Sequence, residues 1–199
     1  RNLFSQIFST WAQTVKRSLQ VNDLNYFLKN FKPLYHKGIL DWIDHSKQFG
    51  MEIIIRNYSK NKSNLLNCFI EDALGEEFLD TEFNMPLTKQ VNRSLTFLEY
   101  EIQRIFNYLK LDGIKLSDKL VNELPDLEAS KLKCSIDAYN IFKERNYEVI
   151  SQINNLIDSN QSIIIESPEE VVYREYKDYK TLSNDQLKII SSYIKNYID

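Results

Sequence analysis

Apolar side chains recur every three or four residues along most of the chain. This spacing places them on one face of an amphipathic helix. It predicts helices over residues 3–19, 34–48, 65–74, 96–109, 135–157 and 183–198. It also predicts a short helix over 22–32 and shorter helical stretches within 114–133 and after residue 167. Because so many segments share the pattern, we expect a fold that is mostly α-helical.

One stretch, Met51-Glu52-Ile53-Ile54-Ile55-Arg56, breaks the helical spacing. Three consecutive β-branched isoleucines favour a strand, and the lack of alternation indicates that both of its faces are buried. Replacing Ile54 with Asp should then bury an unpaired carboxylate and cost about 3–5 kcal/mol. A single strand cannot pair its own main-chain groups, and the sequence contains no equally good partner strand. We therefore expect the chain to be part of something larger.

These patterns predict one domain, or a portion of one, over residues 1–199. Residues 1–75 would form helices around a core strand at 51–56, and residues 76–199 would form a helical extension. A chain of this length can bury a sizeable core. Because the sequence begins with Arg1 rather than Met, we expect the natural N-terminus to lie further upstream.

Composition narrows the classes of partner. A net charge of −3 gives no broad basic field, so nucleic acid is not an expected partner. No apolar run approaches the roughly 18 residues of a membrane span, which favours a cytoplasmic protein. Cys68 and Cys134 are too few for a disulfide framework and lie in apolar-periodic stretches. We therefore expect two buried, reduced thiols.

Familiar catalytic motifs are missing from the sequence. It contains no glycine-rich phosphate loop and no Gly-x-Ser-x-Gly elbow. His36 and His45 are nine residues apart, which does not bring them onto one helix face to hold a metal. Asp41 lies one helical turn before His45, and this spacing suits a surface pair better than a catalytic base. Composition and spacing alone therefore assign no catalytic residue and no metal site.

Three sequence islands carry a family resemblance. Arg1 is followed eight residues later by Ser9; Phe49-Gly50 leads into the predicted strand, which ends at Arg56; and Val91-Asn92-Arg93-Ser94-Leu95-Thr96 precedes a predicted helix. In this order the islands resemble the C-terminal half of bacterial sulfotransferase-like proteins. Members of that family have a P-loop α/β fold and use 3′-phosphoadenosine 5′-phosphosulfate (PAPS).

The resemblance implies a reaction and a partial cofactor site. Arg1 and Ser9 would hold the 3′-phosphate of PAPS, a role that suits guanidinium and hydroxyl donors. Arg56 would be a further cofactor-binding residue at the end of the core strand, where open α/β sheets place ligands. The sulfuryl group would pass from PAPS to a hydroxyl of a glycan or another polar acceptor. Helices beyond residue 60 would shape the acceptor pocket and could form a homodimer contact.

The resemblance is incomplete. Leu3 stands where the family has a proline, and the C-terminal Arg-Lys-Gly phosphate clamp of classical sulfotransferases is absent. The family's phosphosulfate loop and general base lie upstream of the matched segment. Asn146 and a short β-like run at 162–166 are similar to the family's closing segment. The chain would thus carry half a cofactor site and no catalytic residue.

Simpler interpretations of the same residues remain open. Arg1 could be an ordinary surface arginine, Ser9 could bond back to a helix carbonyl, and Arg56 could form an ion pair. Asn92 and Ser94 could serve only to stabilise a turn. The alternative function is a non-catalytic helical module that binds a protein partner, favoured by the high aromatic content and the missing catalytic motifs.

Overall fold

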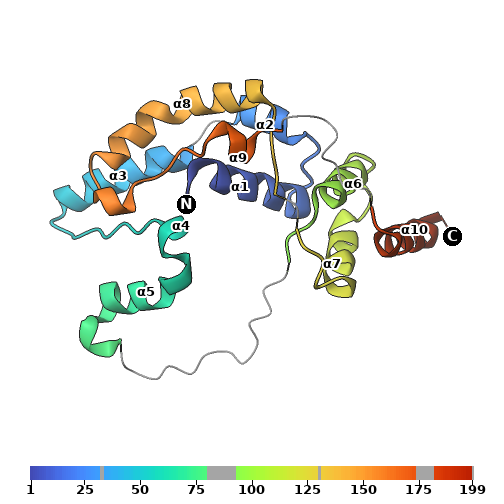
Figure 1. Cartoon of the computed structure of the whole chain (residues 1–199), viewed down its shortest axis with the longest axis horizontal. Coiled ribbons are helices and arrows are strands. Elements are labelled where there is room, and N and C mark those ends of the chain that lie inside the picture. The colour runs from blue at the N-terminus through green and yellow to red at the C-terminus, as the bar shows by residue number, and fades with distance from the viewer. Residues whose placement is uncertain (32–33, 80–92, 130, 174–181, 199) are drawn as a thin grey trace. The chain divides into compact units, whose positions relative to one another are not determined.

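Figure 1 shows the computed structural model of the chain, which describes residues 1–31, 34–79, 93–129, 131–173 and 182–198. The expectation of a mostly helical fold is confirmed. The α-helices are α1 (Leu3–Arg17), α2 (Leu24–Asn30), α3 (Leu34–Gln48), α4 (Tyr58–Asn61), α5 (Leu65–Leu74), α6 (Phe97–Tyr108), α7 (Gly113–Glu123), α8 (Ile136–Asn154), α9 (Pro168–Val171) and α10 (Asn184–Ile198). No helix in the described part of the chain is long and apolar enough to cross a lipid bilayer.

The chain divides into two compact units, each assembled from separated stretches. The first unit comprises Arg1–Gln6, Phe31–Thr88 and Asn140–Glu166. The second unit comprises Ile7–Asn30, Lys89–Tyr139 and Ser167–Asp199. The predicted division of the chain near residue 75 stays a prediction.

The prediction of a buried core strand at residues 51–56 is wrong. This segment runs as open coil between α3 and α4, and no sheet forms among the residues that the structure describes. Ile53 and Ile54 expose 38% and 50% of their surface. A strand is stable only when a neighbouring segment pairs with its N–H and C=O groups. No other described segment offers its main chain to residues 52–56.

The β-like run at 162–166 also forms no strand, but it holds the start of α1. The Glu166 carboxylate accepts the N–H groups of Phe4 (2.8 Å) and Ser5 (2.9 Å), and so caps the first turn. The Leu3 N–H donates to the Ile164 carbonyl at 2.9 Å. Phe4 is fully buried and contacts Phe142 edge-on, with 5.4 Å between ring centroids. The core of the first unit therefore joins residues more than 130 positions apart.

Helices α6, α7 and α10 surround a buried ion pair in the second unit. Arg93 donates to both carboxylate oxygens of Glu99, at 2.8 and 2.9 Å, and also to the carbonyls of Leu120 and Leu124 near the end of α7. Gln186 of α10 donates to the same carboxylate at 3.0 Å. We call these three polar residues, Arg93, Glu99 and Gln186, the Arg93 hub.

Thr96 and Glu99 also form a reciprocal capping box at the start of α6. The Thr96 N–H donates to Glu99 at 2.7 Å, while the Glu99 N–H donates to the Thr96 hydroxyl at 3.3 Å. One carboxylate thus caps a helix and neutralises an arginine at once.

Both cysteines are buried and free, as expected. Burial raises the pKa of the Cys134 thiol to about 12, which makes the thiolate scarce near neutral pH. Cys134 lies at an isolated bridge with Val172, where its N–H donates to the Val171 carbonyl at 2.8 Å. It therefore serves as a packing residue.

Candidate functional site

Arg1 is the predicted site residue whose charge lies open to a ligand. It is an exposed side chain, and its guanidinium carbon lies 4.5 Å from the centroid of the Tyr58 ring, a cation–π contact. Among the described residues, no carboxylate lies within ion-pair distance of this guanidinium. The main chain beside it is anchored, because the Asn2 N–H donates to the Ser59 hydroxyl at 2.9 Å.

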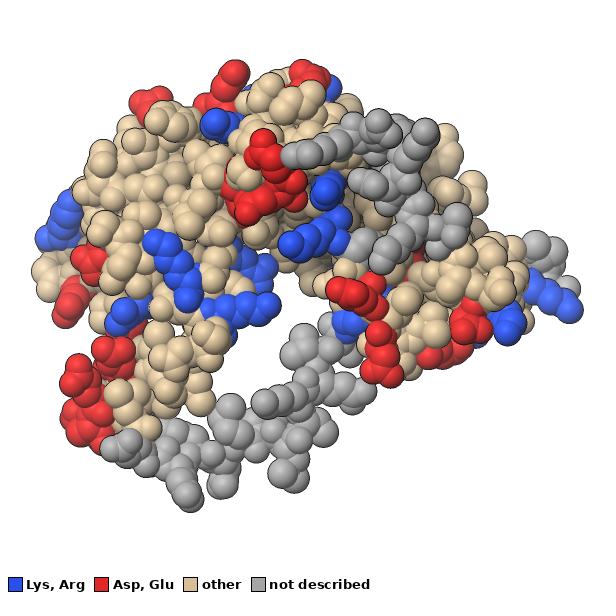
Figure 2. All heavy atoms as spheres, in the orientation of Figure 1, with Lys and Arg blue, Asp and Glu red and all other residues tan. Residues whose placement is uncertain are grey.

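Further cations follow Tyr58 along the chain. Lys60 lies in α4, and Lys62 opens the short turn that continues it. The Lys60 ammonium donates to the Ser159 carbonyl at 3.4 Å, and in the described part of the chain neither lysine has a carboxylate partner. Figure 2 shows Lys and Arg side chains gathered near α4. We call Arg1, Lys60 and Lys62 the α4 cation cluster, because these cations lie over the first residue of α4, within it or directly after it. Positive charges of this kind suit an anionic ligand.

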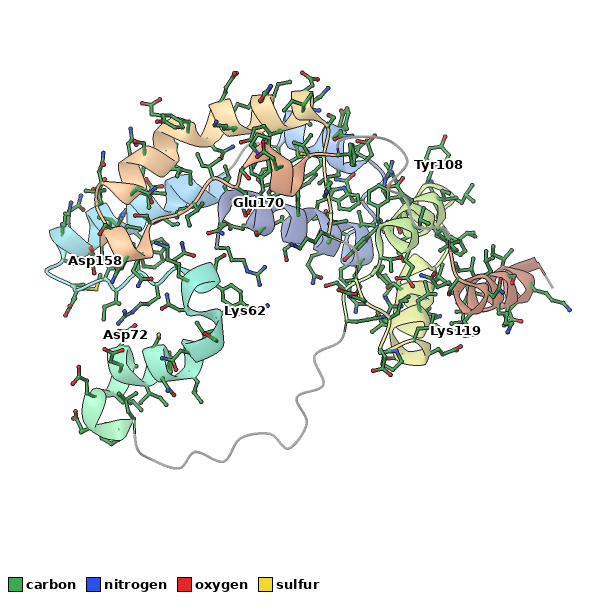
Figure 3. All side chains as sticks on the ribbon, in the orientation of Figure 1. Lys62, Asp72, Tyr108, Lys119, Asp158 and Glu170 are labelled. Atoms are coloured by element: carbon green, nitrogen blue, oxygen red, sulfur yellow. The ribbon has the colours of Figure 1, made fainter. Side chains whose placement is uncertain are left out.

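Arg56 lies in a different environment. Its Nε and Nη2 atoms donate to the two oxygens of Asp72, at 2.9 and 2.5 Å, and Glu71 lies 3.7 Å away. The hydrogen bond to Asp72 raises the pKa of Arg56, and the same bond lowers the pKa of Asp72, labelled in Figure 3. Asp72 therefore already pairs with the arginine that the resemblance assigns to the cofactor, while the Nη1 atom of Arg56 stays open among the described residues. Arg56 ties the coil segment to α5.

Ser9 lies in the part of α1 that belongs to the second unit, and its side chain is half-buried. Arg1 belongs to the first unit. The predicted phosphate site that combines the two residues therefore stays a prediction.

The expected contact between His45 and Asp41 forms, but not between their charged groups. His45 does contact Asp41, but its Nδ1 atom meets the main-chain carbonyl at 2.6 Å rather than the carboxylate. The side chain of His36 lies outside the described residues, as do Val91 and Asn92 of the third island. No group of three or more His, Cys, Asp or Glu side chains suited to a metal occurs among the residues that the structure describes.

The sequence pattern did not identify Tyr58 and Ser59, the two residues that contact Arg1 and Asn2. Tyr58 and Ser59 fall between the predicted strand at 51–56 and the predicted helix at 65–74, where no element was expected, yet Asn57 caps α4 by accepting the Ser59 N–H at 3.0 Å. An Asn followed by a helical turn is the signal that could have revealed α4. Asn146, singled out by resemblance, is fully buried; its Nδ2 atom donates to the Phe142 carbonyl, and its Oδ1 atom accepts no hydrogen bond from the described residues.

Comparisons of the sequence and structure with family models, curated proteins and solved structures found no match. The sulfotransferase resemblance therefore depends on the three sequence islands alone.

Proposed function

We propose that this chain is the C-terminal portion of a sulfotransferase, which moves a sulfuryl group from PAPS to a hydroxyl of a glycan or another polar acceptor. The observation that carries the proposal is the environment of Arg1, an exposed arginine without a carboxylate partner among the described residues, held over Tyr58. Arg56 and Arg93, in contrast, are paired with acids.

The Tyr58 contact helps Arg1 to bind a phosphate. The ring accepts no conventional hydrogen bond from the guanidinium, so the N–H groups of Arg1 can donate two parallel hydrogen bonds to phosphate oxygens. Lys60 and Lys62 add positive charge close to Tyr58 in the sequence. This arrangement supports recognition of the 3′-phosphate that distinguishes PAPS from most adenine nucleotides.

The role of this chain would be binding and alignment. Sulfuryl transfer, like phosphoryl transfer, depends on positioning and on stabilisation of charge. Arg1 and, by resemblance, Ser9 would fix the cofactor through its 3′-phosphate. Arg56 could join only through the part of its guanidinium that Asp72 leaves open. The resemblance assigns the phosphosulfate loop and the general base to a segment upstream of the matched one.

Calorimetric titration of the purified chain with adenosine 3′,5′-bisphosphate tests the proposal. We expect saturable binding that Arg1→Ala weakens by roughly 10- to 100-fold, because a hydrogen bond to a charged group contributes about 1.5–3 kcal/mol. Ser9→Ala should weaken it less. Arg145→Ala, on α8, is the matched control and should leave the affinity unchanged. Binding that is absent, or that persists unchanged in Arg1→Ala, would contradict the proposal.

A second candidate function is the non-catalytic module that binds a protein partner. It is favoured by Ile105, Tyr108 and Leu109, which expose 56%, 77% and 57% of their surface. Their spacing places them on one side at the end of α6, as an apolar stripe without cover among the described residues. If the chain does not bind adenosine 3′,5′-bisphosphate, this second function becomes the preferred one.

A further inference from the structure

The coil segment Met51–Arg56 is held at both of its ends and open between them. The Met51 N–H donates to the Ser46 carbonyl at 2.9 Å, and the N–H of Asn57, the next residue, donates to Gln161 Oε1 at 2.8 Å. Between these anchors, the main chain of residues 52–56 forms no hydrogen bond with another main-chain group that the structure describes. Five consecutive residues therefore present unpaired donors and acceptors.

The chemistry of the segment specifies the kind of partner. A segment with unpaired N–H and C=O groups can add to a β-strand, because a strand offers main-chain donors and acceptors along its whole edge. Ile53 and Ile54 are among the residues that expose large apolar surfaces, and β-branched side chains suit pairing across strands. The exposed coil segment therefore has the composition of a strand and could pair as one if a neighbour supplied the matching main-chain groups.

The order of charges in the segment identifies that neighbour. If two copies pair in antiparallel fashion about Ile54, Ile54 faces Ile54, and Glu52 faces Arg56 of the second copy at both ends. Both charge pairs then lie on one face, since alternate residues of a strand share a face. We propose that residues 51–56 of two copies of this chain form a two-stranded antiparallel interface with two-fold symmetry.

The side chains leave room for this ion pair. Glu52 is exposed, and no described residue forms a hydrogen bond or an ion pair with it. Arg56 donates to Asp72 through Nε and Nη2, which leaves the Nη1 atom for a second carboxylate. Arg56 can therefore join Asp72 of its own copy to Glu52 of the other.

Apolar side chains beside the segment add to the surface that pairing would bury. Phe49 and Met51 at its start expose 70% and 54% of their surface. Leu66 and Phe69 of α5, in the same unit, expose 42% and 65%. Two strands alone are only marginally stable in water, so these side chains are needed to stabilise the interface.

Analytical ultracentrifugation of the full chain over a range of concentrations tests the proposal. The wild type should pass from its mass of 23.6 kDa to twice that value as concentration rises. Glu52→Arg should raise the dissociation constant at least about tenfold, since it replaces two attractive pairs with two repulsive ones. Glu144→Arg, an exposed charge reversal on α8, should leave dimerisation unchanged.

A mixing experiment separates pairing from loss of folding. Arg56→Glu should also prevent dimerisation, yet an equimolar mixture of Glu52→Arg and Arg56→Glu should dimerise, because each mixed pair again joins opposite charges.

In the wild-type dimer, hydrogen exchange should slow at alternate amides of residues 52–56. A wild type that is monomeric at every concentration would overturn the proposal, and so would a dimer unaffected by Glu52→Arg; a strand of another polypeptide would then be the neighbour. The inference goes beyond the proposed nucleotide function and does not depend on it.

Discussion

Glu99 shows how much one side chain can contribute to this fold. Burial alone would raise the pKa of its carboxyl group. Hydrogen bonds from Arg93, Gln186 and the Thr96 main chain outweigh that effect and lower the pKa below its ordinary value of 4.5. The carboxylate is therefore the form that the folded state prefers.

This preference predicts acid sensitivity. A carboxyl group with a depressed pKa in the folded state contributes stability above its unfolded pKa, and the contribution is lost as pH falls through the folded pKa. We expect the free energy of unfolding to fall below about pH 4.5, and to fall less steeply in Glu99→Gln. Urea unfolding at a series of pH values measures both slopes. Equal slopes would show that Glu99 is not the responsible group.

At neutral pH, the same variant should be strongly destabilised. Removing one partner of a buried ion pair leaves Arg93 uncompensated, at a cost of about 3–5 kcal/mol. Glu144→Gln, which removes an exposed carboxylate, should change the free energy of unfolding by less than about 0.5 kcal/mol. A Glu99→Gln chain as stable as this control would exclude a structural role for the Arg93 hub.

Two glycines should respond in opposite ways to replacement by alanine. A Cβ atom at Gly113 would lie 2.2 Å from Nε2 of Gln103, which is itself buried and bonded to Asn107. Gly113→Ala should therefore cost about 1–3 kcal/mol. Gly38 lies within α3 with no heavy atom within 4 Å of its Cβ position, so Gly38→Ala should stabilise by about 0.5–1 kcal/mol. Thermal melts of both variants distinguish these outcomes by their sign.

At the scale of elements, the coil segment 51–56 reverses one expectation from the sequence. Ile54 is half-exposed, so Ile54→Asp has no burial penalty to overcome in the single chain. We expect it to change the free energy of unfolding by about 0.5 kcal/mol or less, measured by urea unfolding of the dilute chain. If the free energy of unfolding fell by about 3–5 kcal/mol instead, Ile54 would be buried, as the sequence pattern predicted. At high concentration the same variant should oppose dimerisation.

The helices could be predicted because their signals are local. A turn of helix is specified by residues three and four positions apart, and caps such as the Thr96–Glu99 box lie within one turn. A strand, in contrast, forms only beside another strand. The residues around Ile54 favour a strand, but no described segment of the chain pairs with them. Arg93 escaped prediction for a related reason: its partners Leu120, Leu124 and Gln186 lie far along the chain.

At the scale of the whole molecule, the candidate site was only partly predictable. The family resemblance pointed to Arg1 and Arg56, but it carried no information about Tyr58 or Asp72, the side chains that distinguish an open arginine from a paired one. Each unit is also assembled from three separated stretches. Such an assembly depends on contacts between distant segments, which periodicity along one segment does not reveal.

The cap on α1 has a consequence for biosynthesis. Phe4 and the Glu166 carboxylate that accepts its N–H are separated by 162 residues. At a translation rate of about 5–20 residues per second, the first turn of α1 waits roughly 8–30 seconds before its capping residue is made. During that interval the apolar Leu3 and Phe4 have no finished core to enter. A ribosome that stalls before residue 166 would therefore leave a nascent chain with a frayed first helix, open to chaperones and proteases.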